Sequence, residues 1–423
     1  MRRAAVVVLS WLLLFVALPT TRATSDLRPT VILISFDGWR WDYDVHADVP
    51  ALRRLSERGV RAAHLVPSFP TKTFPNHYTI VTGLYPGHHG IVANNIRDPK
   101  TGRIFAIGVR REVQDPMWWG GEPIWVTLRR AGQSSAPLFW VGSEAPIGGA
   151  HAQYWKSFDE KLSGPALVDQ LLRLLDLPAS QRPTFLTLYF TDVDAAGHAY
   201  GPESTQVREA IARVDGYLGR LLSGLQRRGV LDRVNVVVTS DHGMSATSRD
   251  RVIFIDDFVT RADGQIVDLN PGLGMVPPQG AEAAVLAKLQ RVHPHLTVYR
   301  REATPPHWHY RAHPRIPPIV GVADDGWLVM ERRSVIDFWK RNVRGVGGNH
   351  GYDPAVASMW TLFVAAGPAF RRGVVVPPFE NVHIYNALCY ILGVTPAPND
   401  GDPAVARQLL ADSVLREGEA LRR

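Results

Sequence analysis

The sequence contains almost no cysteine. Of its 423 residues only Cys389 is a cysteine, so the chain can form no internal disulfide and no zinc cage of thiolates. Cys389 lies in an apolar, helix-like run, where it is expected to be a small buried side chain. Stability must therefore come from a hydrophobic core, and a bound metal would add to it.

Long apolar runs are also scarce. The main exception is at the N-terminus, where Arg2 and Arg3 precede the apolar stretch 4–19 and small residues flank Arg22. This order is typical of a secretory signal, and the run is short for a membrane span. We expect residues 1–23 to be a cleaved signal peptide that exports the chain to the periplasm or the extracellular space. An uncleaved anchor is the alternative.

The sequence has no internal repeat, no low-complexity tract and no basic run interleaved with aromatic residues. Its net charge is +7, but the terminal arginines account for several of these charges. The excess fits attraction to phosphate-bearing substrates only loosely. We therefore predict no specific nucleic-acid partner, and the oligomeric state is left open.

Continuous apolar runs alternate with helical patterns, which predicts an α/β fold around a mostly parallel sheet with helices on its faces. We expect one catalytic domain over residues 24–423. Two insert-like irregular segments, about 94–162 and 251–345, are expected to pack over one end of the sheet. The expected strands are 30–36, 184–190, 234–240 and 361–365, and the expected helices are 50–58, 76–83, 167–177, 203–228, 281–292 and 382–392.

Three of the expected strands run straight into acidic residues. Asp37 follows the first strand, Asp194 comes shortly after the second, and Asp241 follows the third. The carboxyl ends of parallel strands lie along one edge of a sheet, where ligands bind in open α/β folds. A cluster of carboxylates repels itself unless cations neutralise it. The pattern predicts a metal site at this edge.

Three histidines accompany these carboxylates. His198 comes four residues after Asp194, His242 is next to Asp241, and His350 lies in a glycine-rich turn. Oxygen and imidazole ligands without thiolate suit Zn²⁺, with Mn²⁺ or Fe²⁺ as alternatives. Together with Asp37 they make six ligands, which are too many for one tetrahedral site and suit two neighbouring sites. Histidines outside this pattern, His77 among them, are expected to be structural.

The segment 67–78 ends in a helical pattern, and Thr73 stands where a helix N-cap belongs, with Pro75 in the first turn. The start of a helix favours a bound phosphate. Coordination to zinc would lower the pKa of the Thr73 hydroxyl, much as it lowers that of bound water to about 7. Thr73 is thus a candidate nucleophile, and a plain N-cap is the alternative.

Several longer motifs resemble the nucleotide pyrophosphatase/phosphodiesterase family of the alkaline phosphatase superfamily. The resemblance extends in order from about residue 29 to 410 and is that of a bacterial-type single catalytic domain. The segments that carry it are 73–78 (TFPNHY), 83–91 (GLYPGHHGI), 121–125 (GEPIW), 194–202 (DAAGHAYGP), 240–244 (SDHGM) and 395–401 (TPAPNDG).

The resemblance implies two zinc ions, a set of phosphate donors and a nucleotide pocket. The residue at 192 is an Asp where the family usually has Glu, and we assign it no role. The implied ligands of one zinc are Asp37, Thr73, Asp241 and His242, and those of the other are Asp194, His198 and His350. The implied phosphate donors are Asn94 and the backbone N–H of Phe74, the rings that sandwich the base are Phe74 and Phe158, and the other pocket residues are Tyr189 and Trp140.

By resemblance, the chain is a two-zinc phosphodiesterase. It would hydrolyse nucleoside triphosphates and nucleotide diesters to nucleoside monophosphates through a nucleotidyl-threonine at Thr73. The segment 140–162, which lipid-preferring relatives largely lack, is present and favours nucleotides. The alternatives are the same metals acting on a choline-headgroup diester or a phosphate monoester, and a secreted binding protein of this fold without catalysis. A sulfatase is disfavoured because the only cysteine is Cys389.

Overall fold

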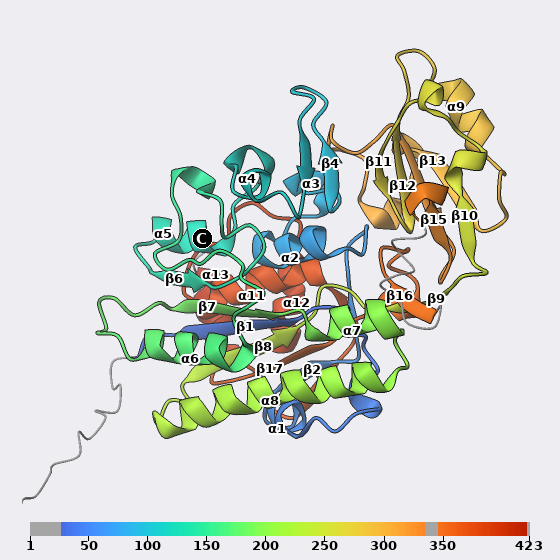
Figure 1. Ribbon diagram of the computed structural model, residues 1–423. Coiled ribbons are helices and arrows are strands. Elements are labelled where there is room, and N and C mark those ends of the chain that lie inside the picture. The colour runs from blue at the N-terminus through green and yellow to red at the C-terminus, as the bar shows by residue number, and fades with distance from the viewer. Residues whose placement is uncertain (1–26, 335–345, 421–423) are drawn as a thin grey trace, which may run out of the picture.

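The computed structural model describes residues 27–334 and 346–420 (Figure 1). The expected signal peptide and residues 335–345 lie outside this part. A seven-stranded sheet forms the centre, in the order β18-β2-β17-β8-β1-β7-β6. The four strands β8, β1, β7 and β6 are parallel, whereas β17 is antiparallel to both of its neighbours. The mostly parallel α/β architecture is therefore confirmed. The strands are β1 (Thr30–Phe36), β2 (Val60–Ala62), β6 (Ser135–Pro137), β7 (Phe185–Phe190), β8 (Val234–Thr239), β17 (Phe363–Ala366) and β18 (Val374–Val376).

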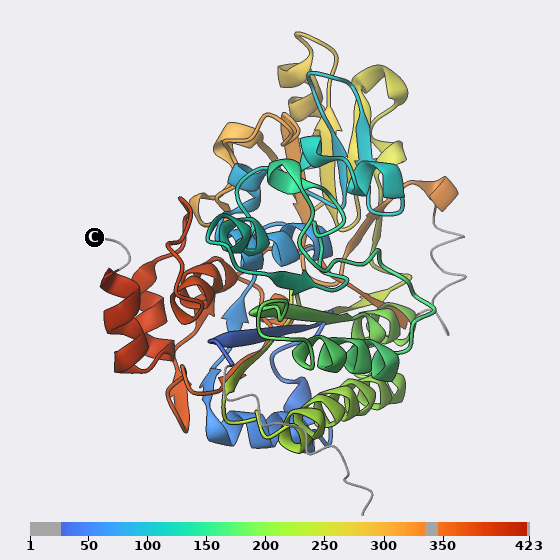
Figure 2. The ribbon, with the colours of Figure 1, turned by 90° about the vertical axis from the view of Figure 1, so that its left-hand side faces the viewer.

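Both faces of the sheet are covered by helices, so its central strands are buried on both sides. Every residue of β1 is buried, and its side chains alternate between two cores. Val31 and Leu33 pack in the core that contains α2 (Thr73–Thr82) and α11 (Ile384–Ile391). Ile32 and Ile34 pack in the core on the opposite face. That face is covered by α1 (Pro50–Arg58), α6 (Gly164–Leu175) and α8 (Thr205–Arg227) (Figures 1 and 2).

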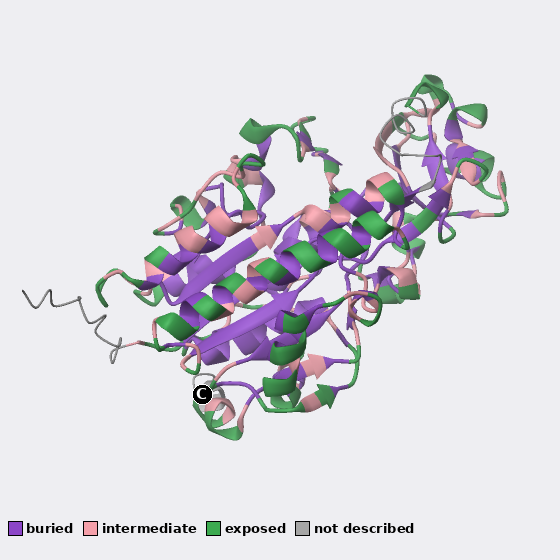
Figure 3. Ribbon diagram, turned by 60° about the horizontal axis from the view of Figure 1, so that its bottom comes forward, coloured by how far each residue is buried: buried purple, intermediate pink, exposed green. Residues whose placement is uncertain are grey.

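The longest helix, α8, shows how sequence pattern decides burial. Its apolar residues recur every three or four positions, as in Val207, Ile211, Val214 and Leu218, and all of them are buried. Figure 3 shows the buried stripe along the helix and the exposed residues opposite. Asp215 breaks the stripe but is also buried, because its carboxylate accepts hydrogen bonds from the first backbone N–H groups of α1.

The first insert-like segment, about 94–162, is partly regular. It contains the hairpin of β4 (Asn95–Arg97) and β5 (Ile104–Ala106) and the helix α5 (Ile124–Arg130). It also supplies the edge strand β6 of the main sheet, which pairs in parallel with β7. Large buried rings, Trp118 and Trp125 among them, join the segment to the core around α2.

The second insert-like segment is more regular than its proline-rich sequence indicates. Its described part forms a four-stranded antiparallel sheet in the order β11-β12-β14-β13, with a hydrophobic core of its own. The sheet stands at one side of the molecule, away from the main sheet (Figure 1). Its elements are β11 (Gln265–Leu269), β12 (Gly272–Val276), α9 (Glu282–Leu289), β13 (Leu296–Arg300) and β14 (Ile319–Ala323).

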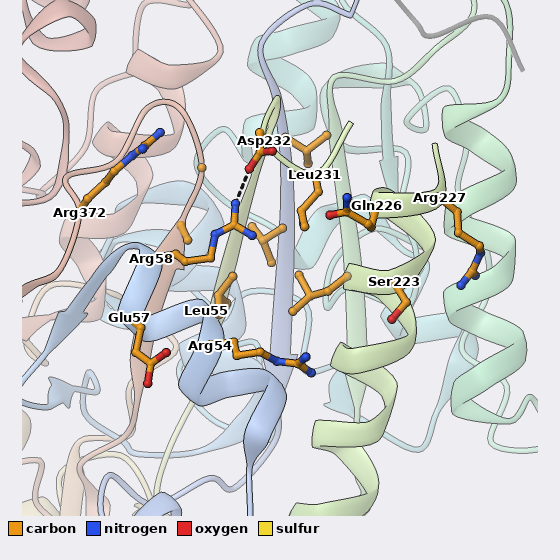
Figure 4. A pocket seen from close by; sticks show the side chains of 15 residues that line it. Arg54, Leu55, Glu57, Arg58, Ser223, Gln226, Arg227, Leu231, Asp232 and Arg372 are labelled. Carbon is orange, nitrogen blue, oxygen red and sulfur yellow. Dashed lines mark hydrogen bonds and ion pairs between the residues drawn. The ribbon is translucent and has the colours of Figure 1, made fainter. Parts of the chain in front are cut away.

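A pocket of about 630 Å³ lies between α1 and α8 (Figure 4). Its walls are apolar, with Leu55 and Leu231, and its rim carries Arg54, Arg58 and Arg372. It reaches the first residue of β8, so it lies at the amino ends of the parallel strands. The predicted carboxylates follow the opposite ends of those strands, so this pocket is not part of the candidate site.

Replacing Asp215 with alanine should leave the first two N–H groups of α1 buried without an acceptor. We expect the free energy of unfolding to fall by about 1–3 kcal/mol. Urea unfolding of wild type, Asp215→Ala and Asp215→Asn should place the asparagine variant in between, since it keeps one acceptor oxygen. Equal stability of all three proteins would show that this contact contributes nothing.

Candidate active site

The three carboxylates predicted from the strand ends lie together. Asp37 directly follows β1, Asp241 follows β8, and Asp194 lies in the first turn of α7 (Asp192–Tyr200) after β7. Gly38 allows this convergence. Its φ of +70° suits glycine, and a Cβ there would come within 2.8 Å of the Asp194 Cα. The backbone N–H of Gly38 also donates to Asp241 Oδ1 at 3.2 Å.

One group of ligand-type atoms is formed by Asp37, Asp241 and His242, all of them buried. The His242 Nε2 is 2.9 Å from Asp241 Oδ2 and 3.4 Å from Asp37 Oδ1. The Thr73 hydroxyl oxygen is 3.2 Å from the same nitrogen. Thus the candidate nucleophile lies directly beside this group.

A second group is formed by Asp194, His198 and His350. The Asp194 Oδ1 is 3.3 Å from His198 Nε2 and 3.7 Å from His350 Nε2. Antiparallel pairing of β16 (Val346–Asn349) with β9 (Ser245–Ser248) brings His350 next to His242. The two imidazole rings lie nearly parallel, so the two groups are immediate neighbours.

Each of the three imidazoles is oriented by a backbone carbonyl. The Nδ1 atoms of His198, His242 and His350 lie 2.9 Å from the carbonyl oxygens of Gly348, Gly243 and Thr71 respectively. A carbonyl oxygen can only accept, so the proton of each ring is assigned to Nδ1. The Nε2 lone pair of each ring then faces the carboxylates, which is the usual arrangement of a histidine that binds a metal.

The arrangement leaves acceptors facing acceptors. The carboxylate oxygens Asp37 Oδ1, Asp194 Oδ1 and Asp241 Oδ2 are buried and have no hydrogen-bond donor among the described residues. Each lies within 3.7 Å of an Nε2 lone pair. Lone pairs that converge in this way repel one another unless a cation lies between them. A donor set of carboxylates and imidazoles in two groups fits two divalent cations of the zinc type.

The charges of the site shift the pKa values of its members in opposite directions. Burial, together with Asp241 and Asp194, raises the pKa of Asp37 well above its usual value. Burial alone would raise the pKa of Asp194 as well. The neighbouring His198 and His350 outweigh this contribution, so the pKa of Asp194 is lowered to about 2. Burial lowers the pKa of His242, and Asp241 more than offsets this effect. The raised pKa of Asp37 shows that its charged form is unfavourable in this buried, acidic setting, and a bound cation would relieve that cost.

The nucleophile segment differs in one respect from the sequence prediction. Helix α2 begins at Thr73, and its N-cap is Lys72, which has extended backbone angles. The side-chain amide of Asn76 donates to the carbonyls of Ser68, Pro70 and Lys72 and so fastens the preceding loop to the helix. As the first helical residue, Thr73 uses its hydroxyl to face His242 rather than to cap the helix.

The predicted phosphate donors lie beside Thr73. The backbone N–H of Phe74 donates to Asn94 Oδ1 at 3.1 Å, so this backbone group and the Asn94 side chain are adjacent. Both residues are partly exposed. An anion next to the Thr73 hydroxyl could therefore accept hydrogen bonds from the Phe74 N–H and the Asn94 amide.

The predicted pocket aromatics lie in three environments: Tyr189 and Phe158 beside a cavity, Phe74 against other rings of the hydrophobic core, and Trp140 inside that core. Tyr189 donates its hydroxyl proton to Asp37 Oδ2 in a short hydrogen bond, and its ring is 5.8 Å from that of Phe158. These two rings line a cavity of about 550 Å³ next to α7. The partly exposed Phe74 does not line this cavity and packs against Phe105 and Trp119.

Trp140 is only 1% exposed, and its indole N–H donates to the His77 carbonyl oxygen at 3.0 Å. Trp140 therefore packs against the backbone of helix α2, whereas the resemblance implied that it would line the substrate pocket. The reason is that its indole N–H finds a buried partner in the helix backbone, so the ring stays in the core.

Sequence reasoning missed the position of His77. This fully buried histidine contacts the Thr73 carbonyl and the Ser35 hydroxyl, and its Nδ1 is 3.4 Å from Asp241 Oδ2. Its spacing of four residues from Thr73, on one face of a helix, was the available signal. Asp192 lies outside both groups and pairs with Arg213 at 2.9 Å.

Comparisons with known proteins show the family of the chain. A family model described as type I phosphodiesterase / nucleotide pyrophosphatase matches residues 31–353. Ectonucleotide pyrophosphatase/phosphodiesterase family member 5 of Homo sapiens is 34% identical over 408 residues, which are 96% of this chain and 83% of that protein. The bis(5'-adenosyl)-triphosphatase enpp4 of Mus musculus is 38% identical over 395 residues, covering 92% and 83%.

Solved structures give the same result. Murine ectonucleotide pyrophosphatase/phosphodiesterase 5 superimposes with a TM-score of 0.84 at 34% identity, over 90% of this chain and 100% of that one. An inactive threonine-to-alanine variant of the murine protein, in complex with AMP, gives 0.83 over 90% and 99%. The chain belongs to the type I phosphodiesterase / nucleotide pyrophosphatase family and is a phosphodiester hydrolase of the alkaline-phosphatase-like fold. Among the described residues no helix is both long and apolar enough to cross a membrane.

Removing bound metal should destabilise the protein, because the carboxylates would then face one another uncompensated. We expect each ion, at a free concentration about a thousandfold above its Kd, to add roughly 4 kcal/mol to the free energy of unfolding. Chemical unfolding with and without chelator, followed by zinc addition, measures this effect. Asp194→Asn should lower the metal content from about two ions to about one. The matched control Asp192→Asn, on the same helix, should retain both, and equal losses in the two variants would contradict this ligand set.

Proposed function

We propose that the chain hydrolyses nucleoside triphosphates and nucleotide diesters to nucleoside monophosphates through a covalent nucleotidyl-threonine at Thr73. The observation that supports this most strongly is the Thr73 hydroxyl, 3.2 Å from His242 Nε2 and at the start of a helix. A partly exposed hydroxyl beside a cluster of metal-type ligands has the surroundings that a nucleophile for phosphorus needs.

Two zinc ions would be held by the two groups of side chains, Thr73 completing the first. When bound, they would neutralise the non-bridging phosphate oxygens and lower the pKa of the threonine hydroxyl. The first set is Asp37, Thr73, Asp241 and His242, and the second is Asp194, His198 and His350. Tyr189 would orient Asp37 through its hydrogen bond, and His77 would support Asp241 from the helix.

In the proposed reaction the partly exposed Thr73 hydroxyl loses its proton to solvent, and its oxygen attacks phosphorus in line with the leaving group, which takes up a proton from solvent. The bond from phosphorus to the alcohol or pyrophosphate oxygen breaks, and the nucleotide stays attached to Thr73. The Phe74 N–H and the Asn94 amide bind a non-bridging oxygen, whose charge grows as the bonds change. Water then cleaves the phosphothreonine bond, which releases the monophosphate and restores the hydroxyl. Two inversions give net retention at phosphorus.

The nucleoside would bind among Phe74, Phe158 and Tyr189, with Trp140 supporting the helix below. Aromatic rings stack on every base and so discriminate little between bases. The AMP complex of the murine relative and the name of the triphosphatase relative support adenine nucleotides, including bis(adenosyl) triphosphate, as substrates. Relatives named as ectonucleotide enzymes support export of the chain, and we propose that residues 1–23 are the signal peptide and are cleaved. Residues 24–423 would then form a single catalytic domain.

Replacing the nucleophile should abolish the reaction without removing the site. We expect Thr73→Ala to reduce kcat more than about a hundredfold, because no covalent intermediate can form. The zinc content should largely survive, since six other ligands stay. Steady-state rates and metal analysis of wild type, Thr73→Ala and the hydroxyl-retaining Thr73→Ser test this. An alanine variant that keeps more than about a hundredth of the wild-type rate would rule out Thr73 as the nucleophile.

A substrate panel separates nucleotides from the alternatives that use the same metals. We expect a nitrophenyl nucleotide, ATP and bis(adenosyl) triphosphate to be cleaved with a kcat/KM at least about tenfold above nitrophenyl phosphocholine and nitrophenyl phosphate, because only nucleotides offer a base for stacking. Phe158→Ala should narrow this gap. A preference for phosphocholine or the monoester would reassign the substrate, and inactivity on every compound with zinc bound would favour a binding protein.

A further inference from the structure

The turn between β11 and β12 reaches from the small antiparallel sheet to the candidate active site. Asp268 lies near the end of β11, and Asn270 and Pro271 form the turn that leads into β12. Asp268 contacts the residue before Thr73, and Asn270 contacts the residue before His350. One turn therefore touches the chain next to the nucleophile and next to a metal-type ligand.

The contact with the nucleophile segment is a buried ion pair. Lys72 Nζ lies 2.6 Å from Asp268 Oδ2, and the two side chains are only 6% and 13% exposed. Burying two charges costs much of the energy that their attraction returns, and removing one partner leaves the other charge buried and uncompensated. Lys72 is the N-cap of α2 and directly precedes Thr73. The ammonium group points towards β11, so Lys72 is not oriented to bind substrate.

The contact with the His350 segment is an amide–amide hydrogen bond. Asn349 Nδ2 donates to Asn270 Oδ1 at 2.8 Å. Asn270 has a φ of +64°, a left-handed conformation that asparagine tolerates better than most residues. Gly351, on the other side of His350, leaves room for the turn, because a Cβ there would lie 2.9 Å from Pro271 Cδ and 3.1 Å from Lys72 Cε.

The two segments are also bonded to each other. The Thr71 carbonyl accepts from His350 Nδ1 at 2.9 Å, and the Thr71 hydroxyl accepts from the Gly351 N–H at 3.0 Å. Thr71, His350 and the turn therefore form a closed set of contacts around the start of α2. A displacement of the turn would move Thr73 and His350 together.

We propose that the β11–β12 turn positions the two halves of the active site. Asp268 fixes Thr73 through Lys72, and we call this chain of contacts the Asp268 arm. Asn270 fixes His350 through Asn349, and this is the Asn270 arm. Asp268 and Asn270 act through other residues and are positioning residues. The inference rests on the proposed function for Thr73 and His350. It gives the small sheet a catalytic purpose, since that sheet holds the turn in place.

The Asp268 arm is tested by the rate of hydrolysis of a nitrophenyl nucleotide. Asp268→Asn removes the charge but keeps the shape, and kcat should fall about tenfold to a hundredfold because the Thr73 oxygen loses its alignment. KM should stay within about threefold. Asp268→Glu, which restores the ion pair, should recover most of kcat.

The matched control is Asp98→Asn. The pair of Asp98 and Arg315 is equally buried, at 10% and 9% exposure and 3.0 Å, and joins the second insert-like segment to the β4–β5 hairpin of the first. Neither Asp98 nor Arg315 is next to Thr73 in the sequence, and neither contacts a proposed metal ligand. Both variants should lose similar stability in urea unfolding, and only Asp268→Asn should lose kcat. Equal kcat in Asp268→Asn and wild type, or an equal loss in both variants, would overturn the Asp268 arm.

The Asn270 arm is tested without any activity measurement. Asn270→Gly keeps the left-handed backbone accessible but removes the acceptor, so zinc should pass from the protein to a coloured chelator about tenfold faster. Asn270→Asp, which keeps the acceptor oxygen, should release zinc at close to the wild-type rate. Unchanged release from the glycine variant would overturn this arm. If wild type hydrolysed no nucleotide, the proposed function would fail, and the zinc-release comparison would still decide whether the turn holds His350.

Discussion

The constraint on which the rest of the structure depends is the convergence of three carboxylates at one edge of the sheet, two of them, Asp37 and Asp241, fully buried. Asp37, Asp194 and Asp241 follow the carboxyl ends of three adjacent parallel strands, so the topology brings them to one edge, and Gly38 permits their close approach. Like charges in a buried site are strongly unfavourable unless cations neutralise them. The three neighbouring imidazoles, each oriented by a backbone carbonyl, complete a donor set that makes sense only around positive charge.

The same edge places the proposed nucleophile. Helix α2 starts there, and Asn76 fastens the preceding loop so that the Thr73 hydroxyl is free to face His242. A parallel sheet, a glycine that permits close approach and a helix start thus combine in a site for phosphoryl transfer. The peripheral antiparallel sheet contacts this assembly through its β11–β12 turn, although the rest of that sheet lies away from the proposed metal ligands.

Much of this could be predicted from the sequence, because the signals were local. Apolar runs ending in Asp indicated the central strands and the carboxylates, the Asp–His spacings indicated His198 and His242, and a glycine-rich turn indicated His350. Long-range contacts could not be predicted. The capping of α2 depends on Asn76 and the loop before it, the burial of Trp140 depends on the His77 carbonyl, and the antiparallel direction of β17 leaves no mark in a short apolar run. The small sheet went unnoticed because its strands are short and separated by prolines.

Anomalous diffraction at the zinc absorption edge, on crystals of the protein grown with zinc, tests the central claim most directly. We expect two anomalous peaks near each other. One peak should lie within about 2.0–2.3 Å of ligand atoms from Asp37, Thr73, Asp241 and His242, and the other within the same distance of ligand atoms from Asp194, His198 and His350. Crystals that show no peak in these two groups, or a single peak shared by all three carboxylates, would contradict it.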